Sequence, residues 1–183
     1  MTLPRLLGIA GALRAGSTNR KLVREAARLF GPAEFTEADL HLPLYDGDLE
    51  AQGIPAEVTR LADQIAAADA VVISTPEYNS ALSGVLKNAL DWVSRTGQPW
   101  AEKPVAIVSA AAGRAGGARA QSSLRLAMTP FRPRLLTWPE VMIANSGNTF
   151  DDQGHLTDAR SVDTLSTLMA ALRAETARLA VAA

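Results

Sequence analysis

The chain has 183 residues, of which 48% are hydrophobic and only 5% aromatic. This length predicts one domain spanning residues 1–183, with enough apolar material for one sizeable core. The charges nearly cancel, with 18 Lys and Arg against 19 Asp and Glu, which argues against a nucleic-acid partner and against an electron carrier steered by a one-signed surface. The sequence has no Cys, which excludes disulfides, thiol catalysis and thiolate ligands, and its two distant histidines make a poor metal site.

The apolar N-terminal stretch is interrupted at Arg14 and is too short to span a bilayer. We interpret it as a buried first strand and not as a signal peptide, because it runs directly into a turn. We therefore expect a cytoplasmic protein that does not associate with a membrane.

Short apolar runs alternate along the chain with longer segments of helical periodicity. Strands are predicted, in chain order, at 6–12, 34–40, 70–74, 104–110 and 135–144. Helices are predicted between and after them at 19–30, 56–68, 83–95, 117–129 and 160–179. The segment 43–55 is rich in Asp, Gly and Pro and is expected to be a loop. The pair Trp138-Pro139 inside the last strand predicts a bend or an edge position.

Strand and helix alternate five times without a linker. This pattern predicts an α/β fold with a doubly wound, five-stranded parallel sheet in the order 2-1-3-4-5. Ligands of such sheets bind outside the carboxyl ends of the strands, at the point where the strand order reverses. The loops after strands one, three and four should therefore build the functional site.

The loop after strand one, Gly11–Arg20, combines small residues with hydroxyl, amide and basic side chains. Backbone N–H groups and a helix N-terminus can hold a phosphate there, and Arg14 can add a charge-assisted hydrogen bond. The loop lacks the Lys of a Walker A motif and the glycine spacing of a dinucleotide fingerprint. Capping of the following helix by Ser17 and Asn19 is the alternative, but the arginine and the two glycines favour a phosphate monoester.

The loop after strand three contains Pro76 and Tyr78, which can form a rigid wall for a planar ring. An ordinary turn with Pro at its corner is the alternative. Taken alone, this short motif favours the turn.

Three motifs in this order resemble the NADPH-dependent FMN reductase family, which includes bacterial chromate, quinone and azo-dye reductases. They are Gly-Ala-Leu-Arg-Ala-Gly-Ser-x-Asn at 11–19, Pro-Glu-Tyr-Asn-Ser at 76–80 and Leu-Lys-Asn-Ala-Leu-Asp-Trp at 86–92. The match spans roughly residues 6–145. The resemblance implies a flavodoxin-like fold, tightly bound FMN, and homodimers or homotetramers with the flavin near a subunit interface.

The resemblance also implies cofactor-binding residues. The phosphate would be held in the first loop by Arg14, Ser17, Asn19 and the adjoining Arg20. The isoalloxazine ring would be framed in the second loop by Pro76, Glu77, Tyr78 and Asn79. Lys87, Asn88 and Asp91 match helix positions expected to support that loop and a dimer contact.

The loop after strand four, 109–117, resembles the family's Gly-rich segment. Ser109 and Gly113 are therefore expected to border the flavin, and Ala111 and Ala112 can offer only backbone contacts. Arg114 is a hypothetical partner for the 2′-phosphate of NADPH, with an exposed, unliganded arginine as the alternative. Trp92, Trp100 and Trp138 are expected in the core or at an interface, and Trp100, in a loop flanked by prolines, is the one of the three expected to come nearest to the flavin.

The sequence holds no Ser-His-Asp set, carboxylate pair or metal cluster, so no catalytic side chain is assigned. FMN would accept hydride at N5 from NADPH or NADH and pass two electrons to a small-molecule acceptor. The predicted function is reduction of quinones, azo compounds, flavins or metal oxyanions such as chromate. An FMN-binding electron carrier or redox-sensing module without NAD(P)H oxidation is the alternative, and a phosphate-ester-binding protein without flavin is a third reading.

Overall fold

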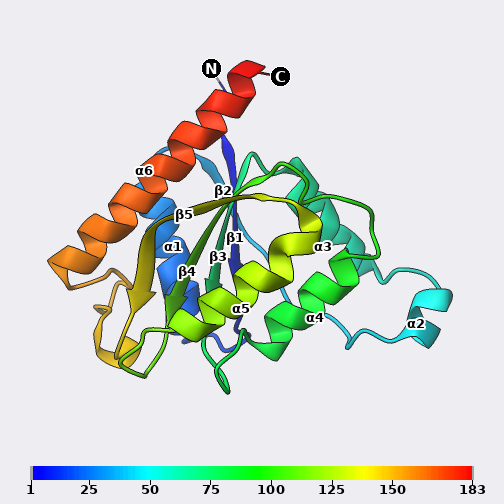
Figure 1. The fold of residues 1–183 in the computed structure, drawn as a ribbon, viewed down its shortest axis with the longest axis horizontal. Coiled ribbons are helices and arrows are strands. Elements are labelled where there is room, and N and C mark those ends of the chain that lie inside the picture. Colours follow the sequence, from blue (N-terminus) through cyan, green and yellow to red (C-terminus); the bar gives the residue numbers. More distant parts are fainter. Residues whose placement is uncertain (1, 183) are drawn as a thin grey trace.

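The computed structural model describes residues 2–182, which form a five-stranded parallel sheet covered by helices on both faces (Figure 1). The strands are β1 (Arg5–Ala10), β2 (Glu34–Glu37), β3 (Ala70–Thr75), β4 (Pro104–Ala110) and β5 (Arg134–Ile143). Their order is β2-β1-β3-β4-β5, and every neighbouring pair is parallel. The predicted fold class and strand order are confirmed.

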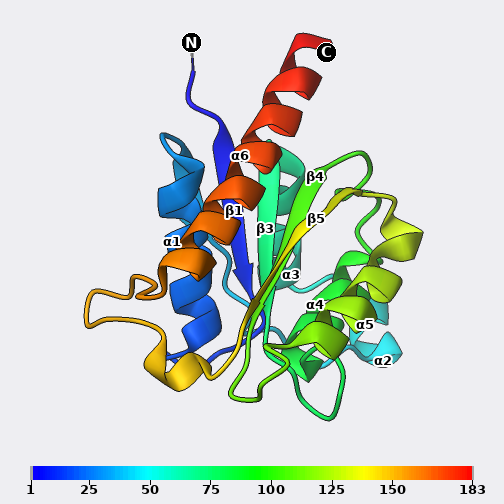
Figure 2. The same cartoon turned by 60° about the vertical axis from the view of Figure 1, so that its left-hand side comes forward.

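Helices α1 (Thr18–Phe30) and α6 (Ala159–Ala182) cover one face of the sheet. Helices α3 (Ala56–Ala67), α4 (Gly84–Val93) and α5 (Ala118–Met128) cover the other, as the turned view of Figure 2 shows. Each helix packs through an apolar stripe. In α1, for example, Leu22, Val23 and Ala26 recur at helical spacing and are fully buried.

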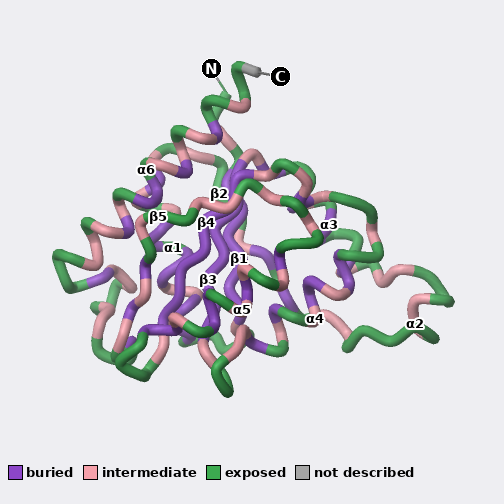
Figure 3. The backbone as a smooth tube through the Cα atoms, in the orientation of Figure 1, coloured by how far each residue is buried: buried purple, intermediate pink, exposed green. Residues whose placement is uncertain are grey.

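The core lies in two layers, one on each side of the sheet, and β3 and β4 are buried along their whole length (Figure 3). Strands covered by helices on both faces need apolar residues on both faces. The apolar runs of β3 and β4 could therefore be recognised as strands from the sequence. Among residues 2–182, no helix combines the length and the apolar character needed to cross a bilayer.

Strand β5 lies at the edge of the sheet and its register is interrupted by a bulge at Trp138-Pro139, where the sequence predicted a bend or an edge position. Ala106 pairs with Leu136 and Val108 with Val141, so the edge strand carries extra residues in between. The bulge leaves Trp138 77% exposed.

Two expectations from the sequence are wrong. The segment 43–55 contains a short helix, α2 (Gly47–Ala51), which projects from the body of the molecule in Figure 1. It was missed because it buries no side chain and so has no apolar periodicity. Trp100 lies in the core, as one of its two expected placements had it, but not near the three loops: it is 2% exposed, packs edge-on against Phe131, and precedes the amino end of β4, whereas the loops follow the carboxyl ends of the strands.

Candidate functional site

The loops after β1, β3 and β4 are joined by the buried side chain of Asn19, in the first turn of α1. Its amide nitrogen donates to the carbonyl of Ala110 at 2.9 Å, at the end of β4. Its amide oxygen accepts from the hydroxyl of Ser74 in β3 at 2.8 Å and from the N–H of Ala110 at 3.1 Å. One residue therefore ties the start of α1 to the carboxyl ends of the two central strands.

The first loop presents free donors at the N-terminus of α1. Ser17 caps the helix by accepting from the N–H of Asn19 at 3.2 Å, so the capping alternative is correct for its hydroxyl. The N–H groups of residues 12–16 donate to no acceptor within residues 2–182, and the Arg14 side chain is exposed beside them. Arg20 instead donates to Glu37 at 2.5 Å. The loop thus offers an anion unpaired N–H groups, a helix N-terminus and one available guanidinium.

The second loop folds as a tight turn that displays Tyr78. Tyr78 and Ala81 exchange backbone hydrogen bonds of 3.2 and 3.1 Å, and Asn79 and Ser80 between them both have positive φ, 50° and 65°. Asn is one of the few residues that adopts this conformation readily. The turn leaves Tyr78 62% exposed.

The first and second loops approach one another closely at Gly11. A Cβ there would lie 2.8 Å from the hydroxyl of Ser83 and 3.3 Å from Cδ of Pro76. Ser83 donates to the carbonyl of Gly11 at 2.7 Å, which fixes this approach. The missing side chain of Gly11 is what lets the two loops meet.

Glu77 faces helix α5, and both of its carboxylate oxygens are engaged there. One oxygen accepts from Arg119 Nε at 2.9 Å, and the other from the N–H groups of Arg119 and Ala120 at 3.1 and 3.3 Å. Burial alone would raise the pKa of the Glu77 carboxyl, but these hydrogen bonds and the charge of Arg119 outweigh burial and hold the pKa below its ordinary value. Glu77 is therefore ionised at neutral pH.

The third loop folds back tightly onto the ends of β4 and β5. Ser109 is fully buried, donates to the carbonyl of Gly116 at 2.6 Å and accepts from Gln121 at 2.9 Å. Gly117 has a φ of 95°, and a Cβ there would lie 2.7 Å from Cβ of Ser109. Gly113 is exposed at the tip, with open space around its Cα. The loop thus presents backbone and small side chains to the site.

Five of the predicted ligands have side-chain polar atoms that already bond within the protein: Ser17, Asn19, Arg20, Glu77 and Ser109. Apart from the cap by Ser17, their partners were missed by the sequence reasoning, because most of them lie more than ten residues away and no local motif marks the pairing. Gln121 and Glu37 are examples, 12 and 17 residues from the side chains they hold. On α4, Asn88 supports the 43–55 segment by donating to the carbonyl of Pro43 at 2.9 Å, and within residues 2–182 its side chain makes no hydrogen bond to the loop after β3.

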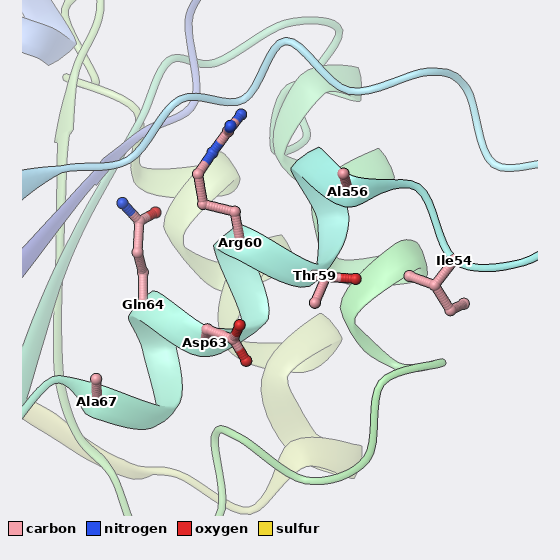
Figure 4. Close-up of a pocket in the computed structure, with 7 residues that line it drawn as sticks. All are labelled: Ile54, Ala56, Thr59, Arg60, Asp63, Gln64 and Ala67. Carbon is pink, nitrogen blue, oxygen red and sulfur yellow. The ribbon is translucent and has the colours of Figure 1, made fainter.

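A cavity of about 280 Å3 adjoins the first loop at the ends of β1 and β2. Its polar lining includes Arg20, Glu37 and His41. A wider groove lies on the outer face of α3, where Thr59, Arg60 and Asp63 line it (Figure 4). No residue lining this second groove belongs to the three loops.

Comparison with known proteins identifies the class of this site. A model of the family described as NADPH-dependent FMN reductase matches residues 4–148, and the chain belongs to that family. It is 45% identical over 178 residues to an NAD(P)H-dependent FMN reductase of Pseudomonas aeruginosa, covering 96% of both chains. It is 40% identical over 169 residues to a quinone reductase of Escherichia coli, covering 88% of this chain and 89% of the relative.

The solved structures agree. The flavoenzyme NAD(P)H:(acceptor) oxidoreductase FerB of Paracoccus denitrificans superposes with a TM-score of 0.87 at 30% identity, covering 96% of this chain and 98% of that one. The fold is flavodoxin-like, and the chain is an FMN-dependent NAD(P)H oxidoreductase.

The residues of the three loops fit FMN. The unpaired N–H groups of residues 12–16 and the guanidinium of Arg14 suit a phosphate monoester. Gly11 allows the first and second loops to approach each other closely, which a Cβ at this position would prevent. The exposed ring of Tyr78 suits contact with a planar aromatic group.

Proposed function

We propose that the FMN phosphate binds at the N-terminus of α1 and that the isoalloxazine ring lies between the loops after β3 and β4. The observation that carries this proposal is the convergence of three loops around Asn19, beside a row of unpaired N–H groups. Arg14 and the backbone N–H groups of residues 12–16 hold the phosphate. Asn19 and Arg20 position this loop, because their side chains are engaged elsewhere in the protein.

Four residues of the second loop frame the ring in different ways: Pro76, Glu77, Tyr78 and Asn79. Pro76 is buried and rigid, and Tyr78, two residues later, presents an exposed aromatic ring at the entrance to the proposed flavin site. Ser109 holds the third loop in place through its hydrogen bond to the carbonyl of Gly116, and Gly113 has no side chain to fill the space at the tip of that loop. Bound FMN supplies hydride acceptance from NAD(P)H and two-electron donation, and the protein supplies orientation and an accessible ring face.

We infer that the acceptor is a planar compound of the quinone type. The relatives of this chain include quinone reductases, and the small residues of the third loop leave the face of the ring open. Because such a site has few polar groups to reject a misfit, azo compounds, free flavins and chromate fall within its range. The near-zero net charge favours an enzyme over an electron carrier.

A homodimer or homotetramer is part of this proposal. Several large apolar side chains are exposed on the described part of the chain, and a second copy would bury such surface; among them are Leu44 at 81%, Leu126 at 75% and Trp138 at 77%. Sedimentation or light scattering of the purified protein tests this point, and a monomer across the micromolar range would contradict it.

The test of the function is the absorption spectrum of the protein with FMN, followed by anaerobic addition of NADPH or NADH and then of a quinone. We expect flavin bands near ~375 and ~450 nm that bleach with the nicotinamide and return with the quinone. Bands that persist with both nicotinamides would favour the carrier or sensor. A protein that binds no flavin would refute the reading of the three loops.

A further inference from the structure

We propose that Glu77 and Arg119 form a positioning clamp that sets the spacing between the two loops on either side of the flavin ring. The inference rests on the proposed function, because it concerns the same site. It assigns Glu77 a role different from that of a flavin ligand, and it brings in Arg119, to which the sequence motifs gave no role.

The clamp connects two elements that belong to different loops. Glu77 lies at the start of the loop after β3, between Pro76 and Tyr78. Arg119 lies in the first turn of α5, directly after the loop that follows β4. The guanidinium reaches one carboxylate oxygen through Nε at 2.9 Å and through a terminal nitrogen at 2.8 Å. This two-point contact fixes direction as well as distance.

The same carboxylate also caps helix α5. The N-cap residue of α5 is Gly117, which has no side chain to accept from the helix N–H groups. Glu77 takes over that task by accepting from the N–H groups of Arg119 and Ala120. A negative charge at this end of an 11-residue helix is also favoured by the helix dipole. The loop after β3 thus supplies the cap that α5 lacks.

These contacts leave Glu77 little freedom to act on a ligand. Its side chain is 11% exposed, whereas that of Arg119 is 65% exposed. Both oxygens point to α5, so the carboxylate acts on the flavin through the position of the two loops. The pair also holds one positive and one negative charge next to each other, so its net electrostatic effect on a nearby ring is small.

The pairing gives two distinguishable consequences when one partner is removed. Glu77→Gln keeps an oxygen that can cap the helix but leaves the positive charge of Arg119 uncompensated. Arg119→Gln leaves a negative charge at the same place. A positive charge near the ring stabilises the more negative reduced flavin, and a negative charge does the reverse. A general loss of stability, without a place for the pair beside the ring, would not give shifts of opposite sign in the two variants.

The experiment measures FMN dissociation constants by quenching of flavin fluorescence and midpoint potentials by anaerobic reductive titration, for wild type, Glu77→Gln, Arg119→Gln and the double variant. We expect each single change to weaken FMN binding about tenfold, and the double change to weaken it by no more than either single change. The midpoint potential of the bound flavin should rise in Glu77→Gln and fall in Arg119→Gln. Arg178→Gln is the matched control, because it breaks another two-point Glu–Arg pair, with Glu175 in the last turns of α6.

Thermal unfolding of each variant without FMN establishes that it is folded, and Arg119→Met, which also removes the positive charge, replaces Arg119→Gln if that variant does not fold. Single variants that bind FMN within twofold of wild type, additive effects in the double variant, or potentials that shift in the same direction would each overturn the clamp while leaving the proposed function intact. Wild-type protein that binds no FMN would overturn both.

Discussion

Replacing Asn19 by Ala should destabilise the protein more than any exposed polar substitution, even before FMN is considered. The change removes three hydrogen bonds and leaves the Ser74 hydroxyl and both backbone groups of Ala110 without their partner. Ser74 and Ala110 are at most 1% exposed, so water cannot replace the lost amide. At about 1–3 kcal/mol for each buried group left unsatisfied, the free energy of unfolding should fall by about 3–5 kcal/mol.

Urea unfolding of the FMN-free protein measures this loss, and the melting temperature should fall by roughly 10 °C for a chain of this size. Asn148→Ala is the matched control, because Asn148 is exposed and its side chain bonds no other residue within 2–182. It should stay within about 0.5 kcal/mol of wild type. FMN affinity should also fall in Asn19→Ala, since the three loops lose the hydrogen bonds of Asn19 that hold them together. An unfolding free energy of Asn19→Ala within about 0.5 kcal/mol of wild type would refute the claim that these hydrogen bonds stabilise the fold.

Three further predictions concern single residues of the loops. The pKa of Glu77 is lower in the folded protein than in the unfolded chain, so its ionised form stabilises the fold above the unfolded pKa, and this stabilisation is lost as pH falls through the folded pKa. The difference in unfolding free energy between wild type and Glu77→Gln should therefore shrink on acidification. A difference that grows in acid would contradict this prediction. Gly117→Ala should lower the free energy of unfolding by about 2–4 kcal/mol in urea unfolding, because φ is 95° and the new Cβ meets Ser109. Gly147→Ala is the control and should be nearly neutral, because the space around that position is open. Arg14→Ala should weaken binding of FMN about tenfold but leave riboflavin binding unchanged in a fluorescence titration, since only FMN carries the phosphate, and an equal loss for both ligands would rule out a phosphate contact.

Much of the fold could be predicted because its signals are local. The runs at 70–74 and 104–110 are apolar at every position, which is typical of strands buried on both faces, and they became β3 and β4 with bounds within one residue. The strand order followed from the alternation of strands and helices, because right-handed crossovers leave few topologies open. The edge position of β5 followed from Pro139, which cannot donate to a ladder.

The convergence of the three loops could also be predicted, because parallel strands bring the loops that follow them to the same end of the sheet. The individual roles of the loop residues could not. Asn19 was expected to contact phosphate, yet its side chain bonds residues 55 and 91 positions away. Nothing in the residues around it indicates which partners the fold will bring near.

Glu77 shows the same limit. The sequence by itself determined that a carboxylate stands in the loop after β3, and that a helix begins at about Gly117. Only the tertiary structure decided that the two lie together, 42 residues apart in the chain, with Arg119 as the ionic partner. Periodicity and turn chemistry act over a few residues and can be read along the chain, whereas the pairing of polar groups depends on how the loops pack after the sheet has formed.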